Sequence, residues 1–160
     1  MSKILILAIG NILLSDDGIG IHILRALQNQ VESWDDVSLM DGGTLSFTLA
    51  ASIEKTAALI VVDAARLEAE PGTVQIFCGE EMDRFLAKSR KSSAHEVNLM
   101  DLMLIAQLEG YWPDYRALVA IQPEKMEWGE FPTHRVALAI PVACQRIREI
   151  IENWRRKSLD

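Results

Sequence analysis

Apolar runs of strand length alternate along this chain with stretches in which apolar residues recur at helical spacing. Short runs that are almost wholly apolar are typical of parallel strands covered by helices on both faces. The sequence therefore predicts an α/β fold, with strands expected over residues 3–9, 37–41, 57–63, 73–78 and 116–121.

Helices are expected between these strands. The first should start near Asp16 or Asp17, where an acidic side chain would cap exposed backbone N–H groups, and its apolar stripe is Ile21, Leu24, Leu27 and Val31. Pro141 is expected to kink the last helix, because proline has no N–H for a straight helix. The other helices are predicted over residues 45–54, 80–87, a stretch that begins after residue 93, and 133–154.

One connection between predicted strands is too short for a parallel crossover. Only residues 64–72 separate two of the predicted strands, and a parallel crossover usually needs about a dozen or more. We therefore expect the strand over 73–78 to run antiparallel. The prediction is a three-layer α/β/α sandwich with a five-stranded, mostly parallel sheet and one antiparallel strand. A chain of 160 residues, 49% of them hydrophobic, suits a single domain over residues 1–160.

Charge and hydropathy narrow the possible partners. A formal charge of -7 and a pI near 5.0 offer no attraction to nucleic acid or anionic lipid. No apolar stretch approaches the roughly 20 residues that span a bilayer, and the apolar run after Lys3 meets Gly10 and Asn11 rather than a cleavage site. Cys78 and Cys144 are far apart, so we expect a cytoplasmic protein with two small buried thiols.

Three polar side chains follow predicted strands or open a helix. In open α/β sheets, ligands bind outside the carboxyl ends of the strands. Asp17, Asp63 and His95 are expected at this edge, and two carboxylates with one imidazole suit nickel, zinc, iron or manganese. Three donors leave open coordination positions, which favours a metal that is brought or shared by a substrate.

Each of these residues also has a simpler interpretation. Asp17 alone is more often a helix cap, and His95 could be an exposed histidine at a helix start. Asp63 is harder to dismiss, because an unpaired buried carboxylate is costly. The glycines after the first strand do not form a dinucleotide loop, since bulky residues follow Gly10 and acids stand where phosphate would sit. His22 and His134 are expected to be surface or packing residues.

Several short motifs occur in one order over nearly the whole chain, and together they resemble the hydrogenase maturation proteases, in the branch that serves membrane-bound uptake NiFe-hydrogenases. They are Gly10-Asn11-x-Leu13-x-x-Asp16-Asp17-Gly18-x-Gly20, Asp41-Gly42-Gly43-Thr44, Val62-Asp63-Ala64, Pro71-Gly72-Thr73, Ser93-Ala94-His95-Glu96, Ile121-Gln122-Pro123-Glu124 and Trp128-Gly129.

The resemblance implies an endopeptidase that removes a C-terminal extension from the large-subunit precursor of a NiFe-hydrogenase after nickel insertion. Its implied metal ligands are Asp17, Asp63 and His95, with nickel carried by the substrate and other divalent ions able to occupy the site in vitro. It implies a phosphorylase/hydrolase-like sandwich. We expect a monomer.

Asp41 is predicted to be a further site residue. Its Asp-Gly-Gly-Thr segment resembles a motif of aspartic proteinases, with which the family is sometimes grouped, although no second such motif is present. Gly42 and Gly43 could equally form only a turn.

Two other functions are kept as alternatives, and the first of them would use the same ligands. One is a nickel-binding chaperone or scaffold without peptidase activity. The other is an unrelated metal-dependent aminopeptidase with its own bound ions.

Overall fold

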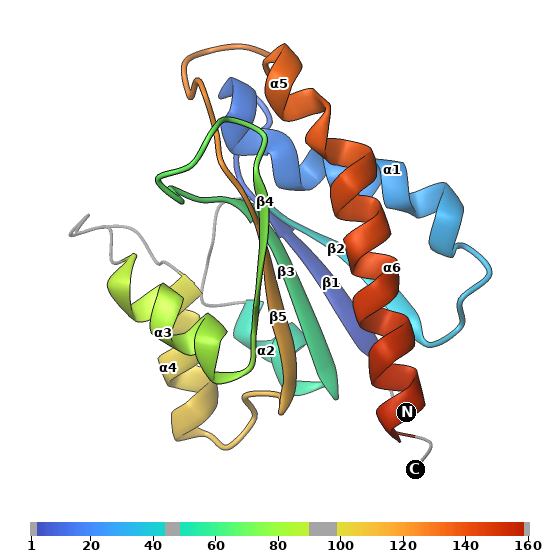
Figure 1. Ribbon diagram of the computed structural model, residues 1–160. Coiled ribbons are helices and arrows are strands. Elements are labelled where there is room, and N and C mark those ends of the chain that lie inside the picture. Colours follow the sequence, from blue (N-terminus) through green and yellow to red (C-terminus); the bar gives the residue numbers. More distant parts are fainter. Residues whose placement is uncertain (1–2, 44–48, 90–98, 159–160) are drawn as a thin grey trace.

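The sheet lies between two layers of helices (Figure 1). The computed structural model describes residues 3–43, 49–89 and 99–158. The strand order is β2-β1-β3-β5-β4, and all described pairings are parallel except that of β4 with β5. The strands are β1 Ile4–Ile9, β2 Val37–Gly43, β3 Ala58–Ala64, β4 Val74–Cys78 and β5 Tyr115–Ile121. The predicted mixed sheet and its antiparallel strand are therefore confirmed.

Among the described residues, three helices cover each face of the sheet. On one face are α1 Ile19–Val31, the short α5 His134–Ala137, and α6 Ala139–Ser158. On the other are α2 Leu49–Glu54, α3 Glu80–Lys88 and α4 Leu99–Leu108. The predicted apolar stripe of α1 is buried.

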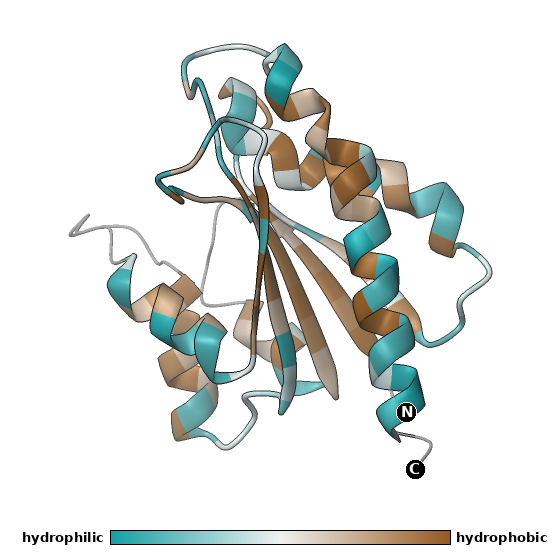
Figure 2. Cartoon of the chain, in the orientation of Figure 1, coloured by the Kyte–Doolittle hydropathy of each residue, from teal (hydrophilic) through white to brown (hydrophobic). Residues whose placement is uncertain are grey.

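The central strands are apolar on both faces because both faces are covered (Figure 2). In β3, Ile60 and Val62 pack toward α1 and α6, whereas Leu59 and Val61 pack toward the opposite helices. Successive side chains of a strand point to opposite faces, so this alternation also assigns a face to the polar residues at the strand ends.

The first helix begins close to its predicted start, but without the predicted acidic cap. Ser15–Gly18 form a 3-10 helix, η1, and α1 starts only at Ile19 without a side-chain cap. The acids at 16 and 17 are engaged elsewhere, because the Asp16 carboxylate accepts from Thr133 and the Asp17 carboxylate from Asn11. The capping prediction was therefore wrong.

The predicted kink lies in the turn that precedes Pro141, because proline has no N–H to donate to the carbonyl of Ala137, four residues back. The helical segment breaks at Leu138, between α5 and α6, and Pro141 is the third residue of α6. Proline is tolerated in a first turn, where the N–H would lack a partner in any case.

Other predictions fall partly outside the described residues. The starts of the helices expected over 45–54 and after residue 93 concern residues 44–48 and 90–98, which are not described. Cys144 is buried as predicted, but Cys78 is exposed, because it ends a strand at the edge of the sheet. No described helix is long and apolar enough to cross a membrane.

Candidate functional site

Asp17 and Asp63 lie at the carboxyl ends of two neighbouring strands. β1 and β3 pair in parallel, with Ala8 opposite Val62. Asp63 is the next residue of β3, and η1, which carries Asp17, follows β1 and packs against β3. Both carboxylates are half-buried. Parallel pairing therefore places two acids that are far apart in the sequence at the same edge of the sheet.

Two glycines allow the chain to fold this closely. Gly10 has a φ of +131°, and a Cβ there would lie 2.0 Å from the backbone oxygen of Asp17. A Cβ at Gly20 would lie 2.5 Å from the backbone oxygen of Val62. Glycine is needed at both positions because of close approach, and at Gly10 also because of its conformation. They hold Asp17 against the ends of β1 and β3.

The Asp17 carboxylate is oriented by its own loop. The backbone N–H of Asn11 donates to its Oδ2 at 2.9 Å, and the Asn11 side chain accepts from the N–H of Leu13 at 2.9 Å. No other donor to this carboxylate occurs among the described residues. A carboxylate held by one N–H retains lone pairs for a cation.

Asp16 has a different role, which the sequence did not reveal. Its carboxylate is fully buried and accepts from the backbone N–H groups of Glu124, Lys125 and Thr133 at 2.7–2.8 Å, and from the Thr133 hydroxyl. It therefore fastens the loop over 122–133 to η1. The adjacency of two acids was the one available signal, since neighbours on a tight turn point in different directions.

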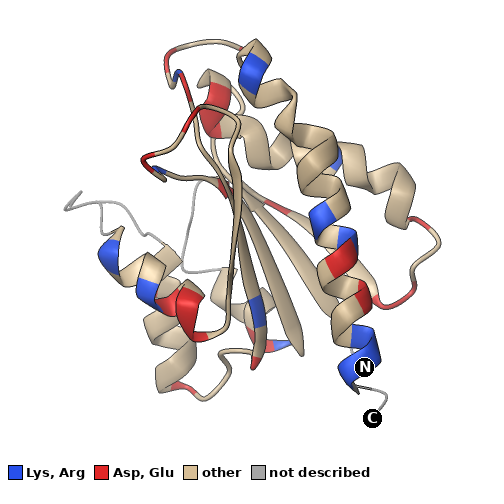
Figure 3. Ribbon diagram, viewed as in Figure 1, with Lys and Arg blue, Asp and Glu red and all other residues tan. Residues whose placement is uncertain are grey.

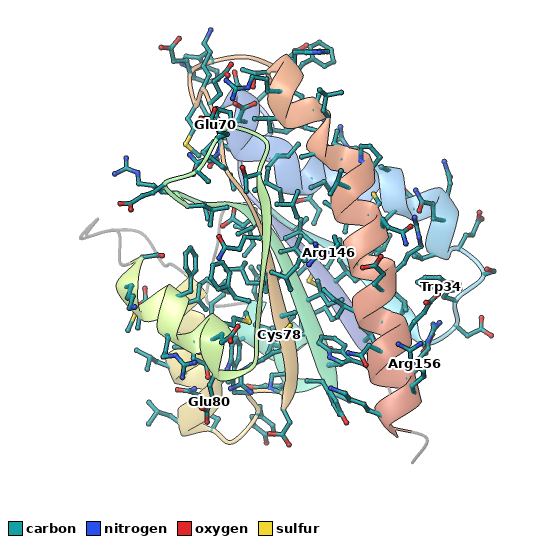
Figure 4. The ribbon with its side chains drawn as sticks, viewed as in Figure 1. Trp34, Glu70, Cys78, Glu80, Arg146 and Arg156 are labelled. Carbon is teal, nitrogen blue, oxygen red and sulfur yellow. The ribbon has the colours of Figure 1, made fainter. Side chains whose placement is uncertain are left out.

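Gln122, part of one of the quoted motifs, is also structural. Its side-chain oxygen accepts from the N–H of Leu67 at 2.6 Å, and its backbone bonds to Gly72 and Thr73 at 2.9 Å. These bonds fix the connection between β3 and β4 at the same end of the molecule, where Figure 4 shows Glu70.

Asp41 lies on the other face of the sheet from Asp63. Asp63 shares the face of Leu59 and Val61, toward α2, α3 and α4. Asp41 lines a shallow hollow with Leu39 and with Leu24, Arg25 and Gln28 of α1. Its Oδ1 accepts from the N–H of Gly43 at 2.8 Å, and Gly43 has a φ of +51°. Asp41 therefore forms the turn at the end of β2, and a role in catalysis stays a prediction.

His95, the third predicted ligand, lies outside the described residues, four positions before α4 begins. α4 packs on the face toward which Asp63 points. Within 3–43, 49–89 and 99–158 no group of three His, Cys, Asp or Glu side chains could hold a metal. The described residues thus supply two of the three predicted ligands, and their oxygen donors fit a divalent cation.

The two remaining histidines agree with their simpler interpretation. His22 is half-buried in α1, and its Nε2 is buried without a hydrogen-bond partner among the described groups. Burial, and then the charge of Arg25, lower the pKa of His22 and keep it neutral. His134 is exposed at the start of α5.

The candidate site is acidic at its centre. Figure 3 shows acidic residues in η1 and in the loops at this end of the sheet. Among described residues, the partners of Asp16 and Asp17 are N–H and hydroxyl groups rather than Lys or Arg. Such an arrangement repels phosphate and attracts cations. The fold and this edge define an α/β protein with an acidic candidate site at the carboxyl ends of its parallel strands.

Comparison with known proteins identifies the family. A family model described as hydrogenase maturation protease matches residues 21–150. The hydrogenase expression/formation protein HupD of Rhizobium leguminosarum bv. viciae is 32% identical over 95% of this chain and 75% of its own length. The hydrogenase 2 maturation protease of Escherichia coli K12 is 34% identical over 78% of this chain and 76% of its own length.

A solved structure has the same fold. The hydrogenase maturating endopeptidase HybD from E. coli superimposes with a TM-score of 0.83 at 31% identity, covering 94% of this chain and 93% of that one. This chain belongs to the hydrogenase maturation protease family, and the predicted resemblance is confirmed.

Proposed function

We propose that this protein is the endopeptidase that removes the C-terminal extension of a NiFe-hydrogenase large-subunit precursor after nickel has been inserted. The observation that supports the proposal is the location of Asp17 and Asp63 at the carboxyl ends of adjacent strands in a member of this family. In the proposal, His95 is the third ligand and nickel belongs to the substrate.

Recognition follows from the donor set. Two carboxylates and an imidazole offer three ligands, too few to fill the coordination shell of a divalent ion. A nickel ion held by the precursor would complete its shell with these side chains, so that a precursor without nickel would lack this contact. The binding energy is then used for selectivity, and water adds across the scissile peptide bond to give a new carboxylate and a free amine.

Asp41 supports the site through its turn in this proposal. An aspartic-type mechanism would instead need its carboxylate to act on water. The variants Asp41→Asn and Asp41→Ala separate the two roles, because an asparagine oxygen can still accept the Gly43 N–H. We expect Asn to keep most of the activity and Ala to lose roughly tenfold or more through the turn. Equal loss in both would support the aspartic-type assignment.

The same proposal places the protein in the cytoplasm as a monomer. Both cysteines are free thiols, one buried and one exposed, which is compatible with a reducing compartment.

The direct test uses the precursor with its extension intact. The purified protein is incubated with nickel-loaded and with nickel-free precursor, and mass spectrometry follows release of the tail. We expect cleavage of the nickel-loaded form only. Binding without cleavage would favour the scaffold function, and cleavage of small peptides by enzyme purified with stoichiometric metal would favour the aminopeptidase.

A further inference from the structure

Four large apolar side chains are exposed beside the candidate site. Trp128 is 77% exposed, Phe131 75%, Leu13 46% and Met126 38%. They come from two loops, 10–15 after β1 and 122–133 after β5. We call these four residues the Trp128 surface.

The two loops form one unit. Leu14 and Gly129 make a parallel bridge, the N–H of Gly129 donates to the oxygen of Leu13 at 2.9 Å, and the N–H of Ser15 donates to that of Gly129 at 2.9 Å. The Ser15 hydroxyl donates to the oxygen of Glu127 at 2.8 Å. Leu13 therefore lies next to the segment that carries Trp128.

Buried polar groups hold this unit in place. Asp16 accepts from both sides of the loop, at Glu124 and Lys125 and again at Thr133. A Cβ at Gly129 would lie 2.6 Å from the Ser15 hydroxyl oxygen, so the contact leaves no space. The apolar side chains thus stand on a fixed backbone, which lowers the entropy lost when a partner binds.

Exposed Trp and Phe side chains on a fixed loop indicate binding. Clustered exposed apolar residues mark interaction sites more often than chance, and Trp is enriched among residues that dominate binding energy. The surface continues into the Asp17 loop, because Leu13 and Asp17 belong to the same glycine-bounded segment.

The charges around the surface restrict its partner. Glu124, Glu127 and Glu130 lie in the same loop; Lys125 pairs with Glu127 at 3.5 Å and Arg135 with Glu124 at 3.6 Å. Since Glu124 and Glu127 each have a cation beside them, repulsion between two copies of this chain comes from Glu130 and from the net charge of -7 on each copy. A partner with an apolar patch rimmed by Lys or Arg is complementary.

We propose that the Trp128 surface docks the folded body of the precursor beside the point where its tail emerges, leaving the tail to enter the Asp17 and Asp63 site. This inference rests on the proposed function. In this inference the enzyme recognises two features of the substrate. Trp128 and Phe131 contact a protein surface, and the acids contact the metal.

The test is the double variant Trp128→Ala, Phe131→Ala against a matched control. Leu108→Ala, Tyr111→Ala removes side chains that are 88% and 50% exposed at the end of α4 and just beyond it, outside both loops. With nickel-loaded precursor, we expect KM of the first variant to rise about 30-fold and kcat to stay within about twofold. The control should match wild type in both.

Two further measurements identify which part of the precursor binds the Trp128 surface. Mature large subunit without the extension should still bind wild-type protein and bind the double variant at least tenfold less. A synthetic peptide of the extension alone should not distinguish them. If the peptide binds wild type and not the variant, the tail occupies the surface and the inference is overturned.

The remaining outcomes also decide. If wild type processes the precursor and the double variant has an unchanged KM, the surface is not a docking site, although the proposed function stands. If wild type does not process nickel-loaded precursor, both fail. Light scattering that shows a wild-type dimer abolished in the variant assigns the surface to a second copy.

The charge variant Glu130→Lys leaves the apolar residues in place and so does not depend on folding of the double variant. It should raise KM, and less so at high salt. An unchanged KM would contradict the basic rim assigned to the partner.

Discussion

Four buried or half-buried acids, two at each end of the sheet, are stabilised in different ways, unlike exposed glutamates that pair with Lys or Arg at both ends. Near the amino ends of the strands, Asp83 pairs with Arg116 of β5 at 2.6 Å, and Asp36, just before β2, pairs with Arg155 of α6. Near the carboxyl ends, the described partners of Asp16 and Asp17 are N–H and hydroxyl groups.

The difference separates structure from function. An acid paired with a guanidinium is neutralised and fixes one element to another. Asp83 ties α3 to β5 and also accepts from the Trp112 indole N–H at 3.0 Å. The half-buried Asp17 carboxylate has no Lys or Arg side chain among its described partners, so it can still attract a cation.

The second Arg-paired acid is supported by an aromatic ring. The Arg155 guanidinium lies 4.7 Å from the centre of the Trp34 ring, beside the C-terminal half of α6 (Figure 4). At this end of the sheet, charged side chains thus help to hold the outer helix α6 in place.

The strongest test of this difference replaces residues at each end of the sheet in turn. Asp63→Asn, and separately His95→Ala, should reduce processing of nickel-loaded precursor by more than about 100-fold, since losing a ligand exceeds the roughly 10–100-fold cost of losing an outer partner. Asp83→Asn should leave kcat/KM nearly unchanged. Mass spectrometry of the tail gives the rate, and circular dichroism checks the fold. Full activity in both site variants would contradict the assignment of Asp63 and His95 to the site.

The next largest effect concerns Asp16, the acid that acts as structure at the functional end. Asp16→Ala leaves three backbone N–H groups without their acceptor, and should lower the free energy of unfolding by about 3 kcal/mol. Urea denaturation measures it. Thr133→Val removes only the hydroxyl and should cost about 1 kcal/mol; equal losses would mean that the carboxylate is not the centre of this contact.

At the other end, Arg116→Met leaves the Asp83 carboxylate with the indole N–H and no cation among its described partners. We expect a loss of about 2 kcal/mol in unfolding free energy with unchanged processing. Adding Asp83→Leu should restore part of that stability, because no charge is then left uncompensated. A fall in processing by the single variant would show that the two ends are coupled.

The smallest effect is a pH dependence. The hydrogen bond from Arg155, with its charge, lowers the pKa of Asp36. Because the folded pKa lies below the unfolded value of about 3.9, the contribution is present above that value and lost as pH falls through the folded pKa. Stability measured by urea between pH 5 and pH 2 should fall less steeply in Asp36→Asn than in wild type. Identical slopes would contradict the role of this pair.

Much of the fold followed from local patterns. Apolar runs gave the five strands within one or two residues, and the short connection over 64–72 correctly predicted that β4 is antiparallel. Helix ends were less predictable. An acid before an apolar stripe resembles a cap, but the Asp16 carboxylate accepts from Thr133 and the Asp17 carboxylate from Asn11 instead.

The sequence by itself determined the order of the elements and the presence of acids after the first and third strands, because strand and helix periods and loop lengths are local properties. Only the tertiary structure decided that Asp16 turns inward while Asp17 stays at the edge, that Asp41 and Asp63 lie on opposite faces, and that Leu13 adjoins the Trp128 loop. These facts depend on contacts between residues up to 117 positions apart, which no local period encodes.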